Sequence, residues 1–450
     1  MKILLYILLY SLLPKNIGAI ASSEINRISL VNLYVSTSID ISTHIVKKFN
    51  EVTLKNNGNV SIDNFEMTIE LELLKKLALI EITAYKKVLK VQYGITKDDR
   101  QIFNVILDQP LKSKKSMVYF LKTIYTNVLI PYPRFSYQDQ PHLVKFYDNI
   151  LFYSPFVTLN QAINIDIGNG YIEKNDKSNL TLLRNNIIFK QFDKIFPYSK
   201  HLIEVHFENL NPFLTITCLK RSVILSLWGF IKVIDEMSIM NTGATLKGSY
   251  QRKFPFQQNR KGSEVLNFQS QLPKNAYGIY LDDEIGKIWS YEVHNNVLNN
   301  ATELLIRPRI ILLGGWKTKL RISYMLPTNF YLYRNETDFT LKLNLIESYF
   351  NNMVINKAYI YIYLPKGAAF SNLKTPFDVY VDSSTNKIIK LKTNNLVQDH
   401  VKYFSLQFHL TKKDQFKNIV LEVLTIVVTF HLILIFLKYS SNLFKHFYIT

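Results

Sequence analysis

Apolar and polar residues alternate with a period of two along much of this chain, the pattern of β-strands whose two faces meet different surroundings. One alternating set predicts a strand over residues 65–73, with five apolar side chains on one face: Phe65, Met67, Ile69, Leu71 and Leu73. Further segments with the same alternation, or rich in β-branched and aromatic residues, are 117–130, 162–167, 214–219, 319–326, 341–345 and 358–364. No amphipathic helix of about 15 residues competes with these strands before the C-terminal region. The pattern therefore predicts a mainly β protein with sandwich-like sheets.

A short apolar run near the N-terminus has the features of a secretory signal. Lys2 precedes an 11-residue apolar run, Ile3 to Leu13, and Ala19-Ile-Ala21 has the small-x-small pattern that signal peptidase accepts. An uncleaved anchor helix is the alternative, but the run is too short to cross a bilayer. We predict that residues 1–21 are a signal peptide.

A second apolar run, residues 419–437, carries only Glu422 and His431 as ionisable groups. Its 19 residues would extend about 28 Å as a helix, close to the thickness of the hydrocarbon layer. We predict a transmembrane helix here, with a buried core helix as the alternative. A cleaved signal would place the preceding chain in the lumen and the short tail, residues 438–450, in the cytosol.

The two ionisable groups of this run differ in depth. Glu422 lies one turn from the lumenal edge, whereas His431 lies about 18 Å beyond the start of the run. His431 is therefore either a packing contact inside a larger membrane assembly or a neutral histidine tolerated in lipid.

The chain between the two apolar runs shows neither a flexible linker nor a repeat of 20–50 residues. Size alone divides it into two β domains, residues 22–220 and 221–418, with a boundary placed to within about 20 residues. The full chain has 54 basic and 35 acidic side chains and a net charge of +19. This charge favours anionic partners or a membrane surface, although a bias toward lysine codons explains it equally well. A secretory route excludes nucleic acid as a partner.

A search for catalytic or metal-binding motifs returns none. The single cysteine, Cys218, rules out an internal disulfide and a multi-cysteine zinc site. The Gly-x₄-Gly spacing of residues 243–248 lacks the lysine of a phosphate loop. We therefore expect no catalytic residue, no metal and no cofactor. Four Asn-x-Ser/Thr sequons are candidate glycan acceptors, at Asn59, Asn179, Asn300 and Asn335.

Several colinear motifs resemble the ribophorin I family, subunit 1 of the eukaryotic oligosaccharyltransferase. The likeness covers most of residues 25–370, and its motifs include Asn241-Thr-Gly-Ala-Thr-Leu-Lys-Gly248, Asp283-Glu-Ile-Gly286 and Leu305-Ile-Arg-Pro-Arg-Ile-Ile-Leu-Leu-Gly-Gly-Trp-Lys-Thr318. The resemblance implies two tandem lumenal β-rich domains and one transmembrane helix in the endoplasmic reticulum membrane. It also implies a non-catalytic subunit of the complex that transfers a preassembled glycan from dolichyl diphosphate to the asparagine of Asn-x-Ser/Thr.

The same resemblance implies the partners. They are the other subunits, including the multi-span catalytic subunit, together with acceptor polypeptides, the translocon and the endoplasmic reticulum membrane. The alternative is a secretory-pathway adhesion or receptor protein with a β-sandwich ectodomain and one span.

The motif of residues 305–318 supplies candidate interface residues. Gly314 and Gly315 allow a tight turn or a close backbone approach, and Trp316, followed by Lys317, can anchor a core or an interface. Arg307 and Arg309, two positions apart, would share one face of a strand and could pair with a partner's carboxylates or a lipid phosphate. The alternative is a turn inside one domain, with a buried tryptophan and intramolecular ion pairs.

Overall fold

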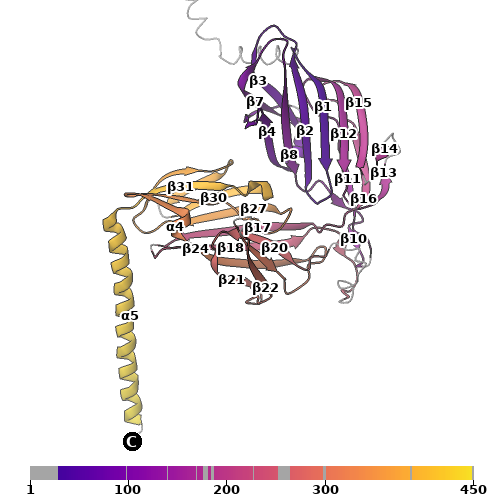
Figure 1. Ribbon diagram of the computed structural model, residues 1–450. Helices are drawn as coiled ribbons and strands as arrows, with labels where there is room; N and C mark the ends of the chain where they lie inside the picture. The colour runs from indigo at the N-terminus through magenta and orange to yellow at the C-terminus, as the bar shows by residue number, and fades with distance from the viewer. Residues whose placement is uncertain are drawn as a thin grey trace, which may run out of the picture.

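The computed structural model describes residues 29–97, 99–138, 140–168, 170–175, 181–183, 187–226, 228–251, 264–296, 301–385 and 388–447. The predicted signal peptide and the sequons at Asn179 and Asn300 lie outside the described residues. The described chain forms two bodies of β-sheet followed by one long helix (Figure 1). The prediction of a mainly β protein with a C-terminal apolar helix is confirmed.

The first body packs a large sheet against two smaller ones, as counted in the described residues. The eight-stranded sheet has the order β14 (Thr181–Leu183), β15 (Ile187–Ile195), β12 (Val157–Asp166), β1 (Leu30–Asp40), β2 (Val46–Asn56), β8 (Ser116–Tyr125), β4 (Leu77–Ala84) and β5 (Lys87–Val88). The smaller sheets are β3 (Ile62–Glu70), β7 (Arg100–Leu111) and β6 (Lys90–Lys97), and β13 (Ile172–Asn175), β16 (Leu202–Glu208), β11 (Leu143–Asn149) and β9 (Ile130–Pro131). Alternate side chains of these strands form two apolar clusters, one around Phe65 and Phe103 and one around Phe146 and Phe207.

The strand predicted over residues 65–73 is too long at its C-terminal end. Phe65, Met67 and Ile69 are buried in β3 as the alternation indicates, but residues 71–74 form one helical turn, α3 (Leu71–Leu74). The turn occurs because the chain leaves the three-stranded sheet here and enters the eight-stranded sheet through β4.

The second body is also layered around one large sheet in the described residues. The seven-stranded sheet has the order β21 (Tyr277–Asp283), β24 (Lys317–Pro327), β18 (Phe230–Asn241), β17 (Leu214–Leu225), β27 (Val354–Tyr363), β30 (Ile388–Val397) and β29 (Tyr380–Thr385). Around it lie β20 (Phe268–Pro273), β23 (Ala301–Ile306) and β22 (Tyr291–Asn296), then β25 (Leu332–Asn335), β26 (Asp338–Asn344), β31 (Tyr403–His409) and β28 (Ala369–Lys374), with α4 (Thr328–Tyr331) and η2 (Gln398–His400). Most of these elements contribute side chains to one continuous apolar core. Arg221 lies inside β17. The chain therefore passes from the sheets of the first body to those of the second before Arg221, between Glu208 and Leu214.

The two bodies are joined by backbone pairing and by side chains. Strand β10 (Phe135–Ser136) pairs in parallel with β19 (Thr245–Leu246), which follows β18. Elsewhere the side-chain amide of Asn395 donates to the carbonyl oxygens of Leu77 (2.8 Å) and Lys76 (3.2 Å). A small buried cluster adds apolar contact between the bodies through Ile45, Ile124, Val354 and Val397.

The C-terminal helix α5 (Lys412–Phe447) begins where the Thr411 hydroxyl accepts a hydrogen bond from the Asp414 N–H (3.1 Å), as an N-cap does. Between Lys412 and Lys438 it is long and apolar enough to cross a membrane, and none of its most apolar stretch is buried in the protein. It extends away from the second body (Figure 1). The predicted span, residues 419–437, lies inside it.

Candidate functional sites at the domain junction and beside the apolar helix

The Gly314-Gly315 pair forms a tight turn against the segment that follows β18. The Gly315 N–H donates to the Asn241 oxygen (2.8 Å), and the Leu246 N–H donates to the Gly314 oxygen (3.1 Å). A Cβ atom on Gly314 would lie 1.8 Å from the carbonyl oxygen of Ala244, and Gly315 has a φ of +81°. Both positions therefore require glycine.

The same segment continues into the first body. The N–H groups of Thr245 and Lys247 donate to the oxygens of Arg134 and Ser136, both at 2.8 Å, and the Thr242 N–H donates to the Phe213 oxygen (2.8 Å). Two of the motifs that carry the family resemblance, residues 241–248 and 305–318, thus meet at the junction between the bodies.

A buried histidine supports this junction. The Nδ1 of His142 lies 3.0 Å from the Asn209 oxygen, and its Nε2 accepts from the Ala244 N–H at 3.4 Å. These bonds require a neutral ring that carries its proton on Nδ1. Burial lowers the pKa of His142 and, with the charge of Lys47, lowers the pKa of nearby His44 to about 4. Sequence reasoning missed His142 because its partners are far away in the chain.

The other residues of the candidate motif lie near the surface. Trp316 is half-buried, with its ring 5.7 Å from that of Tyr250, and Lys317 is exposed at the start of β24.

Arg307 and Arg309 do not share a strand face, so that expectation is wrong. Strand β23 ends at Ile306, because Pro308 has no N–H to continue a ladder. Arg307 instead pairs with Glu292 (2.7 Å) and Arg309 with Asp283 (2.8 Å). Arg309 also donates to the Lys287 oxygen at 3.2 Å, so it ties the Arg-Pro-Arg motif to the loop that begins at Asp283.

The loop after Asp283 is well ordered by its own hydrogen bonds. The Asp283 carboxylate accepts from the N–H groups of Ile285 and Gly286, both at 2.9 Å, and the pairing with Arg309 and these bonds lower its pKa. The Ile288 N–H returns to the Leu281 oxygen (2.9 Å). Two apolar side chains of this hydrogen-bonded loop are exposed to solvent, Ile285 at 73% and Trp289 at 76%.

A contact with α5 lies on another edge of the second body. The Trp228 indole N–H donates to the Glu422 carboxylate of α5. The backbone beside Trp228 is held in turn, since the Thr328 N–H donates to the Gly229 oxygen at 3.2 Å. The other ionisable residue of the apolar run is His431, whose Nδ1 lies 2.9 Å from the backbone oxygen of Val427 in the same helix. Its role as a packing contact in the membrane stays a prediction.

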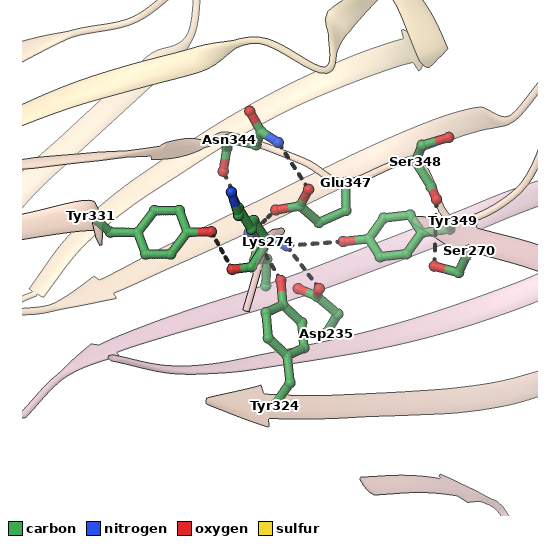
Figure 2. Close-up of polar contacts among 10 residues, drawn as sticks. Asp235, Ser270, Lys274, Tyr324, Tyr331, Asn344, Glu347, Ser348 and Tyr349 are labelled. Atoms are coloured by element: carbon green, nitrogen blue, oxygen red, sulfur yellow. Dashed lines mark hydrogen bonds and ion pairs between the residues drawn. The ribbon is translucent and has the colours of Figure 1, made fainter. Parts of the chain in front are cut away.

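The core of the second body contains an ionic cluster around Arg221, and Figure 2 labels its partners Asp235, Glu347, Tyr324 and Tyr349. The fully buried guanidinium donates to Asp235 at 2.8 Å and to Glu347 at 2.7 Å. The hydroxyls of Tyr349 and Tyr324 lie 3.3 Å and 3.4 Å from it. Burial raises the pKa of Glu347 to about 7 despite the neighbouring guanidinium. The cluster connects β17, β18 and β24 with the segment after β26.

Beside this cluster lies an open cleft of about 600 Å³. Glu347 borders it, together with aromatic side chains that include Tyr333 and Tyr403. Both carboxylate oxygens of Glu347 are already bonded, one to Arg221 and the other to the side-chain amide of Asn344 (3.0 Å). Within the described residues, no three His, Cys, Asp or Glu side chains gather in a way that could hold a metal.

Comparison with known proteins gives a match to the family described as Ribophorin I over residues 30–438. The chain is 28% identical over 403 residues to dolichyl-diphosphooligosaccharide–protein glycosyltransferase subunit 1A of Arabidopsis thaliana, covering 84% of this chain and 65% of that protein. It is 26% identical over 426 residues to subunit 1 of Caenorhabditis elegans, covering 91% of this chain and 72% of that protein. The chain therefore spans slightly less than two thirds of the Arabidopsis relative. The native leukotriene A4 hydrolase of Saccharomyces cerevisiae aligns over 43% of this chain and 29% of its own, at 10% identity and a TM-score of 0.29.

Proposed function

The chain belongs to the ribophorin I family, and on that premise we propose that it is a non-catalytic, single-span subunit of oligosaccharyltransferase. This complex of the endoplasmic reticulum membrane transfers a preassembled glycan from dolichyl diphosphate to the asparagine of Asn-x-Ser/Thr. The observation that carries the proposal is the extent of the match, which includes both β bodies and α5 as far as Lys438.

We assign the two bodies to the lumen as two tandem domains and the end of α5 to the cytosol. The sequons support this assignment, since Asn59 and Asn335 are exposed on different bodies, where lumenal enzymes would reach them. The partners are the multi-span catalytic subunit, the other subunits, acceptor polypeptides and the translocon.

A structural role is supported by what the described motifs build. Their glycines, arginines and Asp283 form a domain junction and an ordered surface loop. Among the described residues, burial raises the pKa of Glu347 to about 7, yet Arg221 and Asn344 occupy both of its oxygens. The chain then contributes a rigid pair of domains at the membrane, and glycan transfer takes place in its catalytic neighbour.

The decisive experiment is affinity purification of the full chain in mild detergent. We expect a multi-span glycosyltransferase to co-purify in near-stoichiometric amount, and depletion of the chain to leave sequons of secreted proteins underoccupied. Recovery of a lone glycoprotein from the cell surface would favour an adhesion or receptor protein instead. Glycan transfer by the purified chain alone would disprove the non-catalytic role.

A further inference from the structure

An apolar patch lies on the second body, on the side toward which α5 extends. It consists of Ile285 and Trp289 on the loop between β21 and β22, and Ile310 after the Arg-Pro-Arg motif, which is 53% exposed. Figure 1 shows β21 and β22 on the lower side of this body, and α5 runs downward from the same body. Exposed apolar side chains that gather on one face commonly mark a contact with a membrane or another protein.

Hydrogen bonds hold the loops of the patch together. Arg309 bridges its two loops through Asp283 and the Lys287 oxygen, so Ile285 and Ile310 belong to one hydrogen-bonded unit. Gly286 has a φ of +147°, a backbone conformation that turns the loop tightly at its tip. The apolar side chains are therefore held in the exposed position and do not fold back onto the core.

The charges around the patch compensate one another. Arg309 pairs with Asp283, Arg307 with Glu292 (2.7 Å) and Lys319 with Glu284 (2.9 Å). A further cation, Lys287, lies over the Trp289 ring at 3.6 Å. A nearly neutral surface with an exposed indole suits the interface of a zwitterionic bilayer, where tryptophan is enriched.

The contact between Trp228 and α5 places the second body near the bilayer, although Trp228 lies at the opposite end of β24 from the Asp283 loop. Glu422 is ten residues past Lys412, or about 15 Å along the helix, so the body lies beside the first turns of α5. Trp228 is itself 53% exposed at the level where the apolar run begins. A body held at this depth presents its lower loops to the same leaflet that α5 enters.

We propose that Ile285, Trp289 and Ile310 insert into the headgroup region of that leaflet, so that the second body rests on the bilayer through two contacts, α5 and this patch. The occupant of the patch is the zwitterionic lipid interface. The proposal requires α5 to span a membrane, as in the proposed function, but it does not require membership of the complex.

The three tryptophans of the chain allow a direct test. The full chain is placed in phosphatidylcholine nanodiscs whose acyl chains carry bromine near the headgroup, and tryptophan fluorescence is compared with unbrominated discs. The double variant Trp228→Phe, Trp316→Phe reports on Trp289 alone. The double variant Trp228→Phe, Trp289→Phe reports on Trp316, the matched control, which is half-buried beside Tyr250.

We expect bromine to quench Trp289 at least threefold more strongly than Trp316, with little change when anionic lipid is added. In the Trp289 reporter, Ile285→Ser together with Ile310→Ser should reduce the quenching, while circular dichroism confirms that the variant is folded. Quenching of Trp289 no stronger than that of Trp316, or quenching that appears only with anionic lipid, would overturn the proposal. Because the isolated chain is used, either result is independent of whether it assembles with a glycosyltransferase.

Discussion

Replacing Gly314 with alanine tests whether the family motif holds the two bodies together. The new Cβ would lie 1.8 Å from the Ala244 oxygen, whereas non-bonded atoms normally approach to about 3.5 Å. The turn at Gly314-Gly315 and the segment after β18 must therefore separate by roughly 1.5 Å. That movement stretches the hydrogen bonds between Gly315 and Asn241 and between Leu246 and Gly314.

The expected cost follows from these contacts. Each of the two hydrogen bonds contributes about 1 kcal/mol net, and overpacking at a tight site costs about 1–3 kcal/mol. The alanine recovers about 0.4–1 kcal/mol by restricting the unfolded chain. The net loss for opening of the junction is then about 2–4.6 kcal/mol, or roughly a 30- to 2,000-fold rise in local hydrogen exchange.

The measurement is amide exchange of Thr245 and Leu246 in the full chain, because these residues form β19 at the junction. The matched control is Gly170→Ala. Its Cβ would also lie 1.8 Å from a backbone oxygen, that of Glu208, but within the first body. We expect the control to loosen the neighbourhood of β16 and to leave the exchange of β19 unchanged. An effect of Gly314→Ala smaller than about threefold at β19, or an equal effect of both variants there, would refute the reasoning.

Three further predictions concern the core, pH and glycosylation. Arg221→Met should lower the free energy of unfolding of the second body by about 3–5 kcal/mol in denaturant titrations, because it leaves two carboxylates buried without their cation, whereas Arg307→Met at an exposed pair should cost no more than about 1 kcal/mol. The pKa of His142 is lowered in the folded chain, so its contribution to stability is present above pH 6.5 and lost as the pH falls below it. Amide hydrogen exchange at Thr245 and Leu246, corrected for intrinsic rates, should therefore rise as the pH falls in the natural chain. The rise should be less steep in His142→Gln. Asn335 is exposed in the β25–β26 turn, so Asn335→Gln should remove one glycosidase-sensitive mobility shift, and an unchanged shift would show that this sequon is unoccupied.

The alternation of apolar residues was a good guide to which side chains face the core. Ala358, Ile360 and Ile362 are all buried in β27, as their spacing indicates. The same alternation overran the end of β3, because leucines also suit the helical turn α3 and a period of two cannot show where a chain leaves its sheet. Pro308 was a usable signal that Arg307 and Arg309 do not continue a strand, since its missing N–H ends the ladder.

The sequence predicted the candidate sites only in part. The glycines of the motif indicated a close backbone approach, but not that Ala244 is the neighbour or that the approach joins two bodies. Arg221, Asp235 and Glu347 carry no local motif, and Arg221 and Glu347 are 126 positions apart. Such groups become a cluster only when the strand order of the second body brings them together.

The sequence alone therefore determined the strand-rich class of the fold, the apolar helix near the C-terminus and the family, because each depends on local periodicity or on short motifs. The tertiary structure decided that two motifs meet at the junction, that Arg221 is paired inside the core, and that Ile285 and Trp289 are exposed on the surface of the second body. The physical reason is that an alternating pattern determines which face a side chain takes within its strand. Which residues it then meets depends on strand order and register, and these are set by packing over the whole body.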